Sequence, residues 1–169
     1  MPSFQQQIPD NHCFGCGPHN PQGLHLQSYW LNGEEGLRST CSFQPANHHN
    51  AGPQHFVNGG IIATVIDCHA ICTAIARAYH DAGRSLGEPD ENGEVIWFAT
   101  GGLSIRYLKP ALLAVSLNVE AVIREVKPKK ITLDCTVKSA GQLCAEAEVV
   151  AVRVPPVWLK PPGSFGNID

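Results

Sequence analysis

The hydrophobic and polar positions divide the chain into short alternating stretches around one long apolar segment. Residues 24–31 and 37–43 alternate between apolar and polar side chains, which predicts two strands joined by a turn at 32–36. Residues 59–82 are apolar or small on most faces and predict a buried helix roughly 36 Å long, with Gly83 as its C-terminal stop. Four further strands, expected to form a meander, are predicted over residues 95–108, 115–126, 130–139 and 143–154.

The order of these elements indicates the fold class. Two strands, one long helix and four strands do not alternate as a parallel sheet requires, so we expect an α+β domain with an antiparallel sheet curled around the helix. The chain of 169 residues is long enough for one such domain. We expect an irregular leader over residues 1–23, the domain over 24–154 and a proline-rich tail, unable to continue a sheet, over 155–169.

Composition excludes several classes of protein. Hydrophobic residues make up 43% and charged residues 16%, so the chain is expected to fold. The net charge of −3 argues against a nucleic-acid partner. No charge-free run of 18 apolar residues occurs and the first residues lack the pattern of a signal peptide, so we expect a cytoplasmic protein without a membrane partner. The odd number of cysteines, seven, mostly in apolar elements, indicates reduced core thiols.

The predicted helix carries the strongest chemical signal. It begins with Gly59 and Gly60, whose bare amide N–H groups would lie at the positive end of the helix, a site suited to a polarised carbonyl or an anion. Asp67 lies deep within the apolar segment, where an unpartnered carboxylate is costly to bury. The combination favours acyl chemistry.

The spacing of these residues predicts an assembly. Asp67 follows Gly60 by seven positions, so both face nearly the same side of the helix, about 10 Å apart along its axis. An aspartate side chain cannot close that gap within one chain. If both groups act on one carbonyl, the carboxylate must come from a second copy, which predicts an obligate dimer with two sites across the interface.

Four segments resemble one known family. They are the leader CFGCGPHNPQGL at residues 13–24, the run GGIIATVID at 59–67, the strand LSIRYLKPA at 103–111 and the closing strands. In this order they are similar to the hotdog-fold acyl-CoA thioesterases of the phenylacetate-degradation type. The resemblance implies a sheet of about five to six strands around one central helix, hydrolysis of an acyl-CoA, no cofactor, and a homodimer or a dimer of dimers. The chain departs from the family at Asn58, where a histidine usually precedes the glycines.

The expected mechanism assigns roles to individual residues. The Gly59 N–H binds the thioester oxygen, and Asp67 of the partner acts either as general base or as nucleophile, two routes that the sequence leaves open. The resemblance implies that Thr100 orients Asp67 or the attacking water. In the loop before the helix, Asn50 could hold the water or the leaving sulfur. The residues expected to bind substrate are Asn50, Asn58 and Gly60.

The leader carries residue types that bind metals. A metal half-site could form from His12, Cys13, Cys16 and His19, but four such close positions are too cramped to coordinate one ion, and a tight turn is expected instead. The histidines of the loop before the helix, at positions 48, 49 and 55, are expected to line the entrance or face solvent. We therefore expect no metal. His69 is expected to be a core histidine with satisfied hydrogen bonds.

Two other functions remain open at this point. A hydratase or dehydratase acting on acyl thioesters could share the fold, although the loss of a histidine at Asn58 counts against dehydration. A non-catalytic protein that binds or senses acyl-CoA could also use this scaffold, although Asp67 argues against it.

Overall fold

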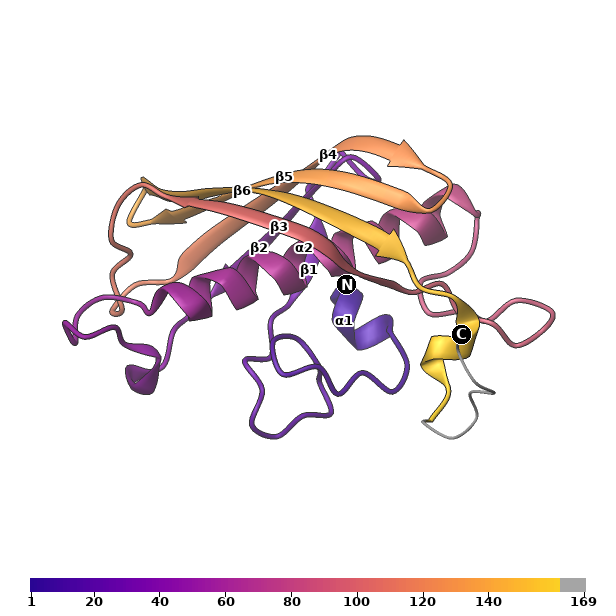
Figure 1. Cartoon of the computed structure of the whole chain (residues 1–169), viewed down its shortest axis with the longest axis horizontal. Coiled ribbons are helices and arrows are strands. Elements are labelled where there is room, and N and C mark those ends of the chain that lie inside the picture. Colours follow the sequence, from indigo (N-terminus) through magenta and orange to yellow (C-terminus); the bar gives the residue numbers. More distant parts are fainter. Residues whose placement is uncertain (162–169) are drawn as a thin grey trace, which may run out of the picture.

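The computed structural model describes residues 1–161 (Figure 1). These residues form one long and one short α-helix, two short 3-10 helices and six strands. In chain order these elements are α1 (Phe4–Gln7), β1 (Ser28–Trp30), β2 (Arg38–Phe43), η1 (Asn47–His49), α2 (Gly59–Asp81), β3 (Phe98–Tyr107), β4 (Leu117–Lys127), β5 (Lys130–Ser139), β6 (Gln142–Arg153) and η2 (Pro156–Leu159).

The six strands form one antiparallel sheet in the order β1-β2-β4-β5-β6-β3. The predicted antiparallel sheet around one helix is confirmed, but the four-stranded meander is wrong. Strand β3 does not pair with β4, which follows it in sequence. It crosses the sheet and pairs with β6, so it forms an edge of the sheet.

Helix α2 forms the centre of the core. The sheet arches over it (Figure 1), and the helix buries residues on several faces, including Val65, Ile66, Ala70 and Ile75. Inward-facing residues of β4 and β5, among them Leu117 and Leu133, are fully buried. By length and composition alone α2 could cross a membrane, but most of it is buried here as the core helix of the fold.

The leader is more ordered than predicted. Ser3 and Gln6 form a capping box that begins α1, and the buried side chains of Phe4 and Ile8 join the core. Figure 1 shows the leader on the side of α2 away from the sheet. Helix α2 is therefore covered by the sheet on one side and by the leader on the other.

The leader also shortens the first strand. Strand β1 begins at Ser28, whereas the alternating pattern begins at residue 24. The backbone N–H groups of Leu24 and Leu26 donate to carbonyls of the leader, at Phe14 and Gly15, instead of to a strand. His25 between them has a positive φ of 53°, which interrupts extended structure.

Candidate active site

The first turn of α2 is capped by the residue before it. Asn58 has an extended backbone, and its side-chain Oδ1 accepts a hydrogen bond from the Gly60 N–H at 2.7 Å. This is the usual geometry of an asparagine N-cap. The prediction that both glycines present bare N–H groups is therefore wrong for Gly60, whose donor is already used by the helix cap.

The amide of Gly59 differs from that of Gly60. Within residues 1–161, no hydrogen bond uses the Gly59 N–H. The Gly59 carbonyl accepts a hydrogen bond from the Tyr107 hydroxyl of β3 at 2.7 Å, which ties the start of the helix to the sheet edge. A cavity of about 380 Å³ opens beside Gly59 and is also lined by Phe56, Leu108 and Lys109. Gly59 thus offers one free backbone donor at the positive end of the helix.

Asp67 and Thr100 are brought together as predicted. The Thr100 hydroxyl, on β3, donates a hydrogen bond to Oδ1 of Asp67, on α2. The strand register shifts between Thr100 and Gly102, so β3 carries a bulge next to this contact. No hydrogen bond among the described residues uses Oδ2 of Asp67, which leaves one carboxylate oxygen free. The roles assigned to both residues stay predictions.

Asp67 faces a small cavity rather than closely packed core. The carboxylate is half-buried and, with Thr100, borders a cavity of about 220 Å³. One wall comes from the leader, which was not expected near the site. The other residues around this cavity are Ile8, Asn11, Cys13, Cys16, Cys68, Ile71, Cys72, Ile75, Trp97, Phe98 and Ala99.

Gly59 and Asp67 do not meet within one chain. They line different cavities, and eight positions along a helix place their backbones about 12 Å apart along the axis. Within one chain Gly59 and Asp67 are therefore too far apart to act on one carbonyl. This separation is the reason why a site shared by two chains was predicted.

Asn50 lies in the loop before α2, at the end of the helix that carries Gly59. It forms a bridge with Val57, and its side-chain amide donates to the Ala51 carbonyl at 2.8 Å. The side chain is half-buried and held by the loop's own backbone. Its expected contact with a water or a leaving sulfur stays a prediction, as do the expected substrate contacts of Asn58 and Gly60.

His69 is a buried core histidine, as predicted. Its Nδ1 lies 2.8 Å from the Ser28 hydroxyl and its Nε2 lies 3.1 Å from the Ser39 hydroxyl. Gln5 of the leader also bonds to Ser28, through its side-chain amide at 2.9 Å. Burial lowers the pKa of His69 to about 4, so the ring is neutral at physiological pH. With both nitrogens occupied, His69 supports the core rather than the chemistry.

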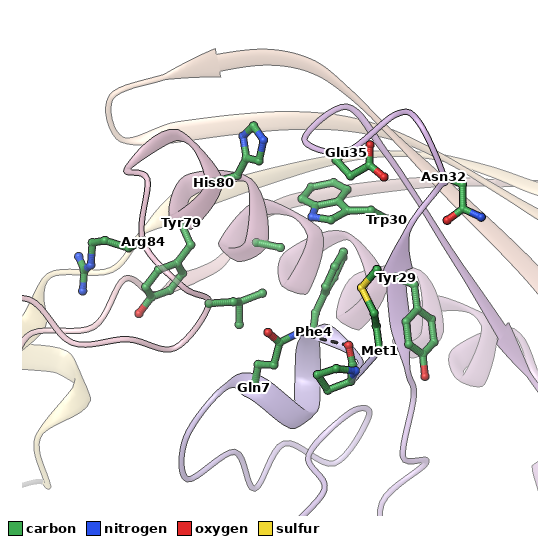
Figure 2. A pocket seen from close by; sticks show the side chains of 13 residues that line it. Met1, Phe4, Gln7, Tyr29, Trp30, Asn32, Glu35, Tyr79, His80 and Arg84 are labelled. Carbon is green, nitrogen blue, oxygen red and sulfur yellow. Dashed lines mark hydrogen bonds between the residues drawn. The ribbon is translucent and has the colours of Figure 1, made fainter.

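A larger cavity lies elsewhere on the molecule. It has a volume of about 610 Å³ and lies between the leader, β1 and the C-terminal end of α2. Figure 2 shows the aromatic rings of Phe4, Trp30 and Tyr79 around it, with His80 and Arg84 at its edge. Asp67 and Gly59 do not line it, so this larger cavity is separate from the candidate catalytic residues.

Comparison with known proteins finds similar chains among the thioesterases. No protein-family model matches the chain. A solved structure of a thioesterase superfamily protein from Shewanella loihica is 33% identical, with 86% of this chain and 96% of that chain covered and a TM-score of 0.59. Rat acyl-coenzyme A thioesterase THEM4 is 26% identical over 133 residues, 79% of this chain and 50% of the relative. The chain thus spans about half the length of that curated relative.

A more distant structure supports the fold alone. The E. coli PaaI protein of the phenylacetic acid degradation operon has a TM-score of 0.60, with 79% of this chain and 82% of that chain covered. Its sequence identity is 12%. Identity at that level says nothing about shared chemistry.

Proposed function

The chain belongs to the thioesterase superfamily, and we propose that it hydrolyses the thioester of an acyl-CoA to a free acid and coenzyme A. The observation that carries this proposal is the hydrogen bonding of the Asp67 carboxylate. Thr100 fixes one carboxylate oxygen, while the other is free beside a cavity of about 220 Å³. A free, oriented carboxylate oxygen at a cavity is what a general base or a nucleophile requires.

The second component is the free N–H of Gly59. A donor at a helix N-terminus stabilises the negative charge that develops on a thioester oxygen, and such donors lower a barrier by about 3–4 kcal/mol. Asp67 then either activates water or attacks the carbonyl carbon. When Asp67 activates water, the water attacks the carbonyl carbon and the C–S bond breaks. When Asp67 attacks, the C–S bond breaks as an acyl anhydride forms on Asp67, and water then hydrolyses that anhydride to release the acid and restore the carboxylate. In both routes the thiolate of coenzyme A takes up a proton.

We propose that these two components meet across a homodimer. Gly59 and Asp67 are separated along one helix, so Gly59 of one protomer would face Asp67 of the other. Strand β3 supports this arrangement because it is an edge strand that exposes apolar side chains, including Leu103 and Tyr107. Sedimentation velocity on the full chain tests it: a stable and active monomer would refute the shared site.

The decisive variant is Asp67→Asn, which keeps the size of the side chain and removes its negative charge. We expect kcat for thiol release from a panel of acyl-CoAs to fall by roughly 100-fold or more. Asp81→Asn is the matched control, since Asp81 lies on the same helix but is exposed and paired with Arg77 at 2.8 Å. Full turnover by Asp67→Asn would disprove the assignment.

The same panel separates the remaining functions. Saturable binding of an acyl-CoA without thiol release would instead support a non-catalytic binding protein. Addition of water to an enoyl thioester, with the thioester intact, would support a hydratase.

Within the superfamily, we propose that the chain belongs to the phenylacetate-degradation type, because of the run from Gly59 to Asp67 and the strand at residues 103–111. Preference for aryl-acyl substrates in the panel would support this placement.

A further inference from the structure

We propose that four cysteines form a structural zinc site that clamps the leader onto α2. Cys13 and Cys16 come from the leader, and Cys68 and Cys72 come from one face of the helix. The sequence predicted no metal here, because His12, Cys13, Cys16 and His19 lie too close together to coordinate one ion. The fold supplies two different ligands, more than 50 residues away along the chain.

The sulfur atoms of Cys13, Cys16 and Cys68 converge, and the Cys72 sulfur adjoins that of Cys16. The Sγ atoms of Cys13 and Cys68 are 3.6 Å apart, and those of Cys16 and Cys72 are 3.7 Å apart. The Sγ atoms of Cys13, Cys16 and Cys68 all lie within 4.8 Å of one another. Since Zn–S bonds are about 2.3 Å long, two sulfurs of a regular tetrahedron around zinc lie about 3.8 Å apart. Both measured pairs approach that separation.

The ligand spacing also suits zinc. The leader provides a Cys-x-x-Cys pair and the helix a Cys-x-x-x-Cys pair, both within the range seen in structural zinc sites. An all-thiolate tetrahedral set selects zinc or an iron–sulfur cluster over harder ions such as magnesium. Four protein ligands would leave no open position, so this ion would stabilise the fold and would not act on substrate.

The surroundings of the cysteines favour a bound ion. Cys16, Cys68 and Cys72 are buried, whereas Cys13 lies on the exposed side and leaves a route for entry. The Asn11 side chain is buried beside the cluster: its amide donates to Cys16 Sγ at 3.9 Å, and its oxygen accepts from the Cys13 N–H at 3.1 Å. Such contacts orient the ligands of a metal.

Zinc binds cysteine as the thiolate, so each of the four thiols would pass its proton to solvent when the ion binds.

A glycine of the leader, Gly15, permits close packing of the leader on the helix. A Cβ atom at Gly15 would lie 2.2 Å from Cys68 Sγ, so only glycine lets the Cys-x-x-Cys turn approach the helix this closely. Since this turn also walls the cavity beside Asp67, the ion would hold that wall in place.

The test uses the full chain and no substrate, so its outcome is independent of the proposed hydrolysis. Protein purified without chelators is expected to contain one zinc per chain by elemental mass spectrometry. Reduced, metal-free protein titrated with Co²⁺ is expected to give the sulfur-to-cobalt charge-transfer band and intense visible bands of a tetrahedral thiolate site. The bands should saturate at one ion per chain and disappear when Zn²⁺ is added.

Variants assign the ligands. Cys16→Ser and Cys72→Ser should abolish the charge-transfer band. Cys41→Ser and Cys135→Ser, at buried cysteines of the sheet, should retain it. The proposal is overturned if wild-type protein in which Cys13, Cys16, Cys68 and Cys72 are reduced takes up neither ion, or if the band survives Cys16→Ser. It is equally overturned if the isolated protein holds Cys13–Cys68 and Cys16–Cys72 disulfides and, once reduced, does not bind cobalt.

Discussion

The buried histidine of the core makes stability depend on pH in a defined window. His69 has no exposed surface, and burial lowers its pKa from 6.5 to about 4. In the unfolded chain the ring has its ordinary pKa. Between about pH 6.5 and pH 4 the unfolded chain therefore binds a proton that the folded chain does not, and acidification favours unfolding.

The size of the effect follows from the two pKa values. At about 1.4 kcal/mol per pKa unit, the neutral ring contributes about 3 kcal/mol to the free energy of unfolding above pH 6.5. This stability is lost as the pH falls through the window, and about 2 kcal/mol of it should be gone by about pH 5. A loss of that size is a large part of the stability of an ordinary domain.

Urea titrations followed by far-UV circular dichroism at about pH 7 and about pH 5 measure this difference. The variant His69→Gln removes the titrating ring, so its free energy of unfolding should change much less between the two values. Exposed His55 is the matched control, and His55→Gln should keep the wild-type dependence. If His69→Gln does not fold, the ring resonances of wild-type protein by NMR still report whether His69 stays neutral at pH 5. A flat wild-type profile would refute the reasoning.

Two further predictions concern stability at positions near the candidate site. Asn58→Ala should lower the free energy of unfolding by about 1 kcal/mol, because the Gly60 N–H loses its acceptor, whereas Asn58→Asp should keep the cap; equal urea midpoints for both would contradict this. Gly101→Ala places a Cβ atom 2.6 Å from Val152 Cγ1 and should cost about 1–3 kcal/mol, while Gly52→Ala, with no atom within 4 Å, should stay within about 0.5 kcal/mol. Thermal melts compare the two glycines, and matching values would show that the bulge can relax.

The sequence predicted the helix and the strands well because each has a clear local signal. The apolar segment from Gly59 and the glycine at 83 predicted a helix over residues 59–82, and the helix in the structure ends at Asp81. The strand predicted at residues 130–139 has the same bounds in the structure. The pairing of β3 was missed because alternation shows which face a residue occupies and not which strand lies beside it.

The site was predicted only in part, for a similar reason. The contact between Thr100 and Asp67 came from the family resemblance, and the side chains do meet. The cap at Asn58 is a local signal that could have been recognised, since asparagine before a helical glycine is a preferred N-cap. Cys68 and Cys72 are four positions apart on one helix face, yet nothing local indicates that Cys13 and Cys16 lie against them.

The docking of the leader on α2 has a consequence during protein synthesis. Cys13 is made 55 residues before Cys68, which at usual rates of translation is a delay of roughly 3–11 s. Throughout that interval the early thiols and the apolar side chains of Phe4 and Ile8 have no surface to cover them. The leader is thus made before the surface that it covers, and its thiols are open to oxidation and its apolar side chains to aggregation until α2 has been made.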